Sequence, residues 1–236
     1  MSNIAIIPAR GGSKRIPRKN VTVFRGRPMI AWTIEAALES GVFDTVLVST
    51  DDVEIAEIAR AEGAEVPFLR KAHADDQSPV SEAIISALHQ AERHYDSSFD
   101  SVTQLMPNCP LRGAEEIRAA WEHFDSGAHR FQISAFEFGW MNPWWAARMG
   151  GDGQPNWLFP EARLSRSQDL DRLYCPTGAI WLAEASALVA ARSFYGPGHV
   201  LWPMPWQAAI DIDDWHDLQM AEALAQMTRH GGAEGA

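Results

Sequence analysis

The chain contains 236 residues, of which 46% are hydrophobic and 22% charged, and its formal net charge is -11. This size and composition exclude a disordered chain and suit one folded domain, or one domain with a sizeable insertion. No apolar stretch is long enough to span a membrane, and no basic leader with an apolar core stands at the N-terminus, so we expect a cytoplasmic protein without a membrane partner.

The first 136 residues alternate between patterns typical of buried strands and of amphipathic helices. Short apolar runs predict strands at residues 3–7, 45–49 and 101–106, and residues 130–136 are also expected to be extended. Apolar residues at helical spacing, with capping residues at their ends, predict four helices: one that ends at Gly41, one that starts at Asp51 or Asp52 and ends at Gly63, one that starts at Ser78 or Ser81, and one over residues 113–124.

This alternation indicates the fold class. Further strands are predicted at residues 179–182 and 208–212, followed by a helix over residues 214–228. Strand, loop and helix repeated at this interval predict an α/β protein with a Rossmann-like, mainly parallel sheet and helices on both faces. In such folds ligands bind at the carboxyl ends of the strands.

The regular alternation stops between residues 139 and 172, where four tryptophans stand among glycines and prolines. We therefore expect a main domain made of residues 1–138 and 173–230, an insertion at 139–172, and a mobile tail at 231–236. The insertion either covers a substrate or pairs with another subunit. Three of its tryptophans suit stacking on a sugar as well as packing between subunits: Trp140, Trp144 and Trp145.

Positive charge is concentrated at the N-terminus of this acidic chain. Residues 1–34 contain no Asp or Glu and seven basic residues: Arg10, Lys14, Arg15, Arg18, Lys19, Arg25 and Arg27. Because the whole chain carries -11, the remaining residues carry -18. So acidic a remainder leaves no extended basic face for nucleic acid, and we expect a small, strongly anionic ligand instead.

The segment "ARGGSKR", residues 9–15, has the chemistry of a phosphate-binding loop. Backbone amides exposed by Gly11 and Gly12 can approach phosphate oxygens closely, and Arg10 and Lys14 add positive charge. The segment is neither a Walker A motif nor GxGxxG, because the spacing of its glycines and lysine differs from both. The alternative interpretation is a solvated basic loop.

An acidic pair stands far along the chain in "IDID", where Asp211 and Asp213 are two residues apart at the end of a predicted strand. Carboxylates at this spacing point to the same side and can hold a hard divalent ion, with phosphate oxygens as further ligands. Alternatively, the pair forms a solvated turn, or Asp213 caps the helix that follows.

Several motifs together resemble the acylneuraminate cytidylyltransferases, the CMP-sialic acid synthetase family. They span nearly the whole chain in the family's order: "IIPARGGSKRIPRKN", "VSTDDVEIAEIARAEGAEVPFLR", "MPNCPLR", "RSQDL", "PTGAIW" and "IDIDDWHDLQMAE". The resemblance implies transfer of CMP from CTP to the anomeric hydroxyl of a nine-carbon 2-keto sugar acid, with release of pyrophosphate. It also implies a nucleotide-diphospho-sugar transferase-like fold and a homodimer.

The resemblance also implies roles for single residues. For the triphosphate it implies Arg10, Gly11, Gly12, Ser13, Lys14 and Lys19, and for the rest of the nucleotide Asn20, Arg70 and Ser81. Asp211 and Asp213 match the ligands of the family's Mg²⁺. Arg10, Lys14 and Asp211 are the expected catalytic residues, because an in-line displacement at phosphorus depends on positioning and on stabilising the charge that develops.

The residues expected at the sugar depart from the sialic acid branch. Arg166 and Gln168 of "RSQDL" suit a sugar carboxylate. Met106 stands where that branch has Gln in "QPTSPLR", and Thr177 where it has Asn in "NGAIY". Because both changes remove an amide, we expect pseudaminic or legionaminic acid to be favoured over N-acetylneuraminic acid. The forms "EVPFLR" and "RSQDL" resemble those of the pseudaminic acid branch.

Two alternatives remain open from the sequence. A CTP-dependent synthetase for the eight-carbon acid Kdo, or another sugar nucleotidyltransferase, would share the basic loop but not "RSQDL" with "PTGAIW". A catalytically silent nucleotide-binding relative would not need both Asp211 and Asp213. The motifs leave open the sugar's substituents, the choice of nucleobase and any general base.

Overall fold

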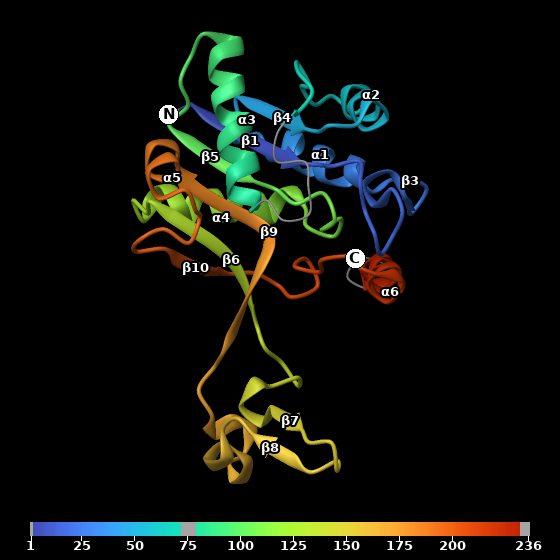
Figure 1. Ribbon diagram of the computed structural model, residues 1–236, viewed down its shortest axis with the longest axis vertical. Helices are drawn as coiled ribbons and strands as arrows, with labels where there is room; N and C mark the ends of the chain where they lie inside the picture. The colour runs from blue at the N-terminus through green and yellow to red at the C-terminus, as the bar shows by residue number, and fades with distance from the viewer. Residues whose placement is uncertain (1, 72–78, 232–236) are drawn as a thin grey trace.

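The computed structural model describes residues 2–71 and 79–231 (Figure 1). Ser78, one of the two predicted helix starts, lies outside these residues, as does the predicted mobile tail apart from Gly231, where the last helix ends. None of the described helices is long and apolar enough to cross a membrane.

A six-stranded sheet forms the centre of the molecule, in the order β10-β6-β9-β5-β1-β4. The strands are β1 (Asn3–Pro8), β4 (Thr45–Ser49), β5 (Ser101–Gln104), β6 (Phe131–Glu137), β9 (Tyr174–Glu184) and β10 (Val200–Pro203). β1 is parallel to β4 and β5, and β10 is parallel to β6, whereas β9 is antiparallel to both of its neighbours. The prediction of a mainly parallel sheet is confirmed.

Helices cover both faces of this sheet: α1 (Met29–Ser40), α2 (Val53–Ala61), α3 (Val80–Tyr95), α4 (Ala114–Ser126) and α5 (Ala185–Ala191). Alternate residues of β1 point to opposite faces, so that Ala5 and Ile7 pack in the core cluster that contains residues of α1, α2 and α4. Ile4 and Ile6 pack in the cluster that contains residues of α3 and α5. The prediction of helices on both faces of the sheet is confirmed.

The ends of the first helices follow the sequence signals closely. Asp52 caps α2, because its carboxylate accepts hydrogen bonds from the backbone nitrogens of Glu54 (2.9 Å) and Ile55 (3.1 Å). Gly41 ends α1 with a positive φ of 68°, a conformation that costs glycine little. α3 begins at Val80, and Ser81 lies inside its first turn rather than before it.

The predicted strand at residues 208–212 is wrong, because these residues form turns and an irregular segment outside the sheet. Ile210 and Ile212 are buried, but they pack in a third core cluster with Ile16 and with Leu218 of α6 (Trp215–Gly231). A short apolar run has the same sequence pattern whether it packs against a neighbouring strand or against a helix, so the pattern cannot distinguish the two.

The edge of the sheet is formed instead by β10, which the sequence pattern does not predict. Its four residues alternate between half-buried and exposed, so that they contain no buried run. The short helix α5 and the hairpin of β2 (Val23–Phe24) with β3 (Arg27–Pro28) are also additions to the predicted elements.

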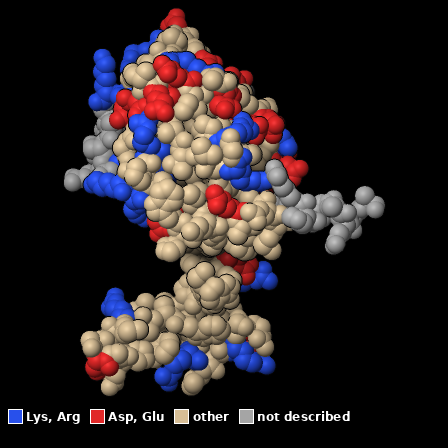
Figure 2. Space-filling model, turned by 90° about the vertical axis from the view of Figure 1, so that its right-hand side faces the viewer, with Lys and Arg blue, Asp and Glu red and all other residues tan. Residues whose placement is uncertain are grey.

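Residues 139–172 lie in a lobe at the end of a neck that is formed by the outer ends of β6 and β9 (Figure 1). The lobe contains the hairpin of β7 (Ala147–Met149) with β8 (Pro155–Trp157) and three 3-10 helices: η2 (Pro143–Trp145), η3 (Pro160–Leu164) and η4 (Ser167–Asp169). Figure 2 shows that it stands apart from the body and that much of its surface is neither acidic nor basic. β9 is longer than predicted because it continues from the sheet into the neck.

Candidate active site

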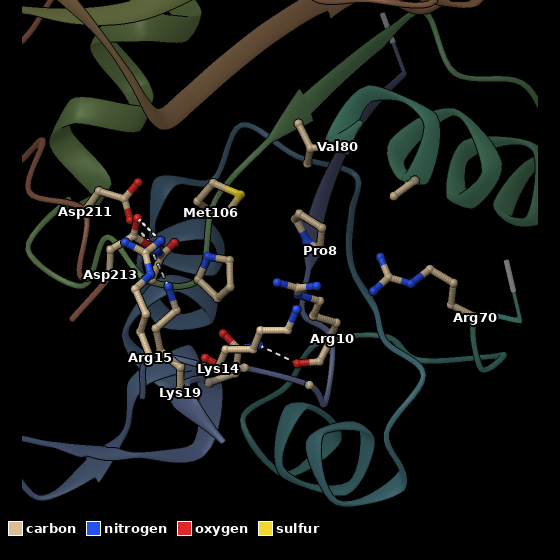
Figure 3. Close-up of a pocket in the computed structure, with 16 residues that line it drawn as sticks. Pro8, Arg10, Lys14, Arg15, Lys19, Arg70, Val80, Met106, Asp211 and Asp213 are labelled. Carbon is tan, nitrogen blue, oxygen red and sulfur yellow. Dashed lines mark hydrogen bonds and ion pairs between the residues drawn. The ribbon is translucent and has the colours of Figure 1, made fainter. Parts of the chain in front are cut away.

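A cavity of about 530 Å³ opens at the carboxyl ends of β1 and β5. One wall is the loop that follows β1, which contributes four cationic residues: Arg10, Lys14, Arg15 and Lys19. The other walls come from Arg70, the start of α3, the loop after β5 and the two aspartates. In Figure 3, Asp211 and Asp213 lie at one end, Arg70 at the other, and Arg10 and Lys14 between them.

Backbone and side-chain hydrogen bonds hold the basic loop, residues 9–15, in place. The Gly11 nitrogen donates to Asp51 Oδ1 (2.9 Å), and Asn20 Nδ2 donates to the Arg10 carbonyl oxygen (2.9 Å). A Cβ at Gly11 would lie 2.6 Å from Asp52 Oδ2, whereas a Cβ at Gly12 would meet no described atom within 4 Å. Gly11 is therefore required for close packing on α2, and Gly12 faces open space beside the cavity.

Two of the cations hold Asp213. Lys19 Nζ donates to Asp213 Oδ1 (3.0 Å) and to the Ile212 carbonyl oxygen (2.8 Å), and Arg15 Nη2 donates to Asp213 Oδ2 (2.7 Å). Partial burial favours the neutral carboxyl, but the hydrogen bonds and charges of Lys19 and Arg15 outweigh it and lower the pKa of Asp213. These contacts join the N-terminal loop to a segment about 190 residues further along the chain.

Asp211 differs from Asp213. Its Oδ1 accepts a hydrogen bond from Asn108 Nδ2, and its Oδ2 has no hydrogen-bond partner among residues 2–71 and 79–231. The side chain reaches solvent in the cavity but is surrounded by protein atoms, and this desolvation, together with the negative charge of Asp213, raises the pKa of Asp211 to about 6. A nearby cation would stabilise its ionised form.

Arg70 is only 6% exposed, and its guanidinium points towards the cavity (Figure 3). Its Nη2 lies 4.0 Å from Asp51 Oδ1, and its Nε has no hydrogen-bond partner among the described residues. Burial and the charge of Arg10 lower the pKa of Arg70 against the opposing effect of Asp51. A buried guanidinium with an unpaired donor suits an anionic or carbonyl-bearing ligand.

The structure brings most of the predicted nucleotide residues together. Arg10, Gly12, Ser13, Lys14, Lys19, Asn20 and Arg70 line the cavity, as do Met106, Asp211 and Asp213. Gly11 belongs to the loop but does not line the cavity, and its nitrogen donates to Asp51 instead of facing the cavity as predicted. Ser81 is buried behind the wall, where its Oγ accepts a hydrogen bond from the Phe194 nitrogen (3.4 Å). Thr177 is also buried, and its Oγ1 donates to the Ala209 carbonyl oxygen (3.0 Å), just before Asp211.

Arg166 and Gln168 do not line this cavity, because both lie in the lobe. Arg166 is paired with Asp169 (Nε to Oδ2, 2.8 Å), and Gln168 lines a separate cavity of about 240 Å³ at the base of the lobe. Within one chain, the residues predicted for the sugar are thus divided between two places.

Two polar residues of the cavity, Arg15 and Asn108, were absent from the predicted set. Arg15 was visible as part of the basic cluster, but nothing local indicates that it contacts Asp213. Asn108 was visible only as a polar residue in the loop after a strand, and its contact with Asp211 joins residues 103 positions apart.

Comparison with known proteins identifies the family. The family model described as "Cytidylyltransferase" matches residues 4–134. The chain is 36% identical over 225 residues to a pseudaminic acid cytidylyltransferase of Campylobacter jejuni, covering 95% of this chain and 96% of that protein. It is also 36% identical over 239 residues to a CMP-N,N'-diacetyllegionaminic acid synthase of Legionella pneumophila, covering 97% and 98%. An N-acylneuraminate cytidylyltransferase of Streptococcus agalactiae is 31% identical, covering 92% of this chain and 52% of that protein.

Solved structures agree in fold. A CMP:2-keto-3-deoxy-manno-octonic acid synthetase complexed with CTP matches with a TM-score of 0.70 at 17% identity, covering 97% of this chain and 100% of that chain. A 4-diphosphocytidyl-2C-methyl-D-erythritol synthase from Anaerococcus prevotii matches with a TM-score of 0.65 at 12% identity, covering 95% and 98%. The family model and the relatives confirm the resemblance seen in the motifs, and the chain belongs to the cytidylyltransferase family.

Proposed function

We propose that the protein transfers CMP from CTP to the anomeric hydroxyl of a nine-carbon 2-keto sugar acid and releases pyrophosphate. The observation that carries the proposal is the cavity at the carboxyl ends of β1 and β5, in which four cations of the loop after β1, together with Arg70, share the lining with two aspartates. It is supported by 36% identity, over nearly the whole chain, to proteins named for CMP transfer to pseudaminic and legionaminic acids. Because CTP is a cytoplasmic metabolite, we place the reaction in the cytoplasm.

The cationic wall is the proposed triphosphate site. Arg10, Lys14 and Lys19, with Ser13 and Gly12, surround space large enough for phosphates, whereas the Gly11 nitrogen is already engaged with Asp51. Negative charge grows on the leaving pyrophosphate as the sugar oxygen attacks the α-phosphorus, and Arg10 and Lys14 would stabilise it. Asn20 and Arg70, which line the same cavity, are the proposed contacts to the rest of the nucleotide, whereas Ser81 lies behind the wall and would support it from there.

The aspartates fit a divalent ion that arrives with the nucleotide. The described residues contain no group of three or more His, Cys, Asp or Glu side chains that could hold a metal by themselves. Asp211 Oδ2 has no hydrogen-bond partner among the described residues, and desolvation together with the charge of Asp213 raises the pKa of Asp211, so a cation between the two aspartates and the phosphates would stabilise the ionised carboxylates. When bound, Mg²⁺ would neutralise phosphate charge and make the sugar hydroxyl more acidic.

A homodimer would complete the sugar end. Arg166 and Gln168 lie in the lobe, away from the cavity of their own chain, and several large apolar side chains of the lobe are exposed: Trp140, Met141, Met149, Leu158 and Leu164. We propose that the lobes pair two chains, so that Arg166 and Gln168 of one protomer serve the cavity of its partner.

Mixing two inactive variants tests this arrangement. We expect Arg166→Ala, which removes the cation for the sugar carboxylate, to lower kcat/KM roughly 10²-fold. Combined in equal amounts with Asp211→Asn and allowed to exchange subunits, it should recover about a quarter of wild-type activity, because half of the dimers would hold one complete site. A monomeric mass in solution, or no recovery after proven exchange, would contradict the proposal.

The proposed sugar is pseudaminic or legionaminic acid rather than N-acetylneuraminic acid. Met106 lines the cavity with a thioether, and the Thr177 hydroxyl is engaged with Ala209, so neither position offers the amide that the sialic acid branch has there. The identity to the two named synthetases, 36%, exceeds the 31% identity to the N-acylneuraminate enzyme.

A pyrophosphate-release panel tests the function directly. CTP, UTP, ATP and GTP would each be combined with neuraminic, pseudaminic, legionaminic and Kdo acids in the presence of Mg²⁺. We expect release only with CTP and the pseudaminic or legionaminic acid. Release with Kdo alone would point to the eight-carbon synthetase, and no release with any pair would point to a silent nucleotide-binding relative.

A further inference from the structure

Asn108 connects the loop after β5 to the segment that carries Asp211. The residue is 2% exposed, and its amide nitrogen donates to both Asp211 Oδ1 and the Ile212 carbonyl oxygen (3.2 Å). Its own backbone oxygen accepts a hydrogen bond from the Ile212 nitrogen (2.9 Å). Three hydrogen bonds thus hold this segment to one buried asparagine.

The orientation of the amide follows from its surroundings. Both groups that face Nδ2 are oxygens that only accept hydrogen bonds from it, so the atom between them must be the NH₂ group. The other end of the amide, Oδ1, is buried without a partner among the described residues. Asn108 therefore contributes through its donor end, which is directed at the aspartate.

The loop itself is anchored to the core, so that Asn108 acts from a fixed position. Thr33 Oγ1 of α1 donates to the Met106 carbonyl oxygen (3.3 Å). The buried Arg112 donates from Nη1 to the carbonyl oxygens of Ala179 (2.6 Å) and Met106 (3.4 Å). By contrast, the segment at residues 208–213 lies outside the sheet and takes its position from such contacts.

We propose that Asn108 is a positioning residue for the reaction: it fixes Asp211 through Oδ1 and leaves Oδ2 for the metal–nucleotide complex. The inference rests on the proposed function. In the branch motif "QPTSPLR" a threonine stands at the equivalent place, and its hydroxyl offers one donor where the Asn108 amide offers two. The two hydrogen bonds that Asn108 donates therefore depend on the residue that this chain has at position 108, and threonine is the natural conservative variant.

The test compares Asn108→Leu and Asn108→Thr with the wild type and with Gln132→Leu. Gln132 is a matched control, because it is a fully buried amide whose Nε2 donates to the Ala120 carbonyl oxygen (2.8 Å) at the opposite end of the sheet. Mn²⁺ would serve as the probe, with bound and free ion separated by electron paramagnetic resonance in the presence of CTP. Thermal unfolding would be followed on the same samples, and kcat and KM would be measured with Mg²⁺.

We expect Asn108→Leu to weaken Mn²⁺ binding and lower kcat by about 10- to 100-fold, as for other residues that orient a metal ligand, with little change in the KM of the sugar. Asn108→Thr should fall between this variant and the wild type. Gln132→Leu should lower the melting temperature without changing Mn²⁺ binding. Wild-type Mn²⁺ affinity and kcat in Asn108→Leu, or in Asn108→Thr if the leucine variant does not fold, would overturn the proposal.

A double-mutant comparison separates positioning from a merely structural role. In an Asp211→Ala background, Asn108→Leu should weaken Mn²⁺ binding no further, because the group through which Asn108 acts is gone. Equal additional weakening in both backgrounds would refute positioning. The Mn²⁺ readout does not need turnover, so a wild-type enzyme that releases no pyrophosphate would refute the proposed function while this comparison still decides the role of Asn108.

Discussion

The two walls of the cavity are built in different ways. The cationic wall is a continuous loop directly after β1, closed by the local hydrogen bond from Asn20 to the Arg10 carbonyl oxygen and set on Asp51 through the Gly11 nitrogen. The acidic wall is an irregular segment placed by contacts with Asn108, Thr177 and Lys19, which come from distant parts of the chain. The sequence alone thus brings the cations together, because they are neighbours in the chain. The positions of Asp211 and Asp213 opposite them depend on contacts made by the whole fold.

The largest expected effect comes from the acidic wall. Asp211→Asn keeps the size of the side chain and removes its charge, so it should lower kcat by about 10³-fold or more while the fold stays intact. Steady-state pyrophosphate release measures the loss, and circular dichroism checks the fold. Full activity in this variant would refute the assignment of Asp211.

The cationic wall can be dissected with a matched pair. Lys14 lines the cavity, whereas Arg25 belongs to the same basic cluster but lies against Trp32, 5.7 Å from the ring centroid. We expect Lys14→Ala to lower kcat/KM for CTP by about 10²- to 10³-fold and Arg25→Ala to change it little. Equal losses in the two variants would mean that total charge, rather than position, matters.

The packing of the cationic wall against the start of α2 predicts a smaller effect, on stability rather than activity. A Cβ at Gly11 would meet Asp52, the cap of α2, at 2.6 Å, whereas one at Gly12 would meet no described atom. Gly11→Ala should therefore destabilise the protein by about 1–3 kcal/mol and Gly12→Ala by much less, as measured by urea unfolding. The reverse order would show that the loop is not fixed at Gly11.

The smallest expected effect is the pH dependence of stability that Asp211 contributes. Its folded pKa of about 6 lies above the usual value, so the folded state binds the proton more tightly, and the favourable contribution is lost as the pH rises towards 6. Without divalent ions, Asp211→Asn should therefore melt about 1–3 °C above the wild type at pH 7.5, and the difference should shrink as the pH falls through about 6. A difference independent of pH would contradict the raised pKa.

The sequence was sufficient for the elements whose signals are local. β1, α1, β4 and α2 follow from apolar runs, a capping aspartate and Gly41, all within a few residues of the structure they specify. The cations of the loop after β1 reach one cavity because they are neighbours in the chain. The family, too, was visible in the spaced motifs.

Only the tertiary structure decided what depends on contacts between distant residues. Ile210 and Ile212, predicted to lie in a strand, pack against α6 instead, and β10 forms one edge of the sheet. The tertiary structure also brought Asn108 to Asp211 and placed Arg166 in a lobe away from the cavity. The reason is that the hydrophobic effect has no preferred direction or partner. An apolar side chain favours burial and a buried polar side chain requires a hydrogen bond, but the packing of the whole chain determines which residue it contacts.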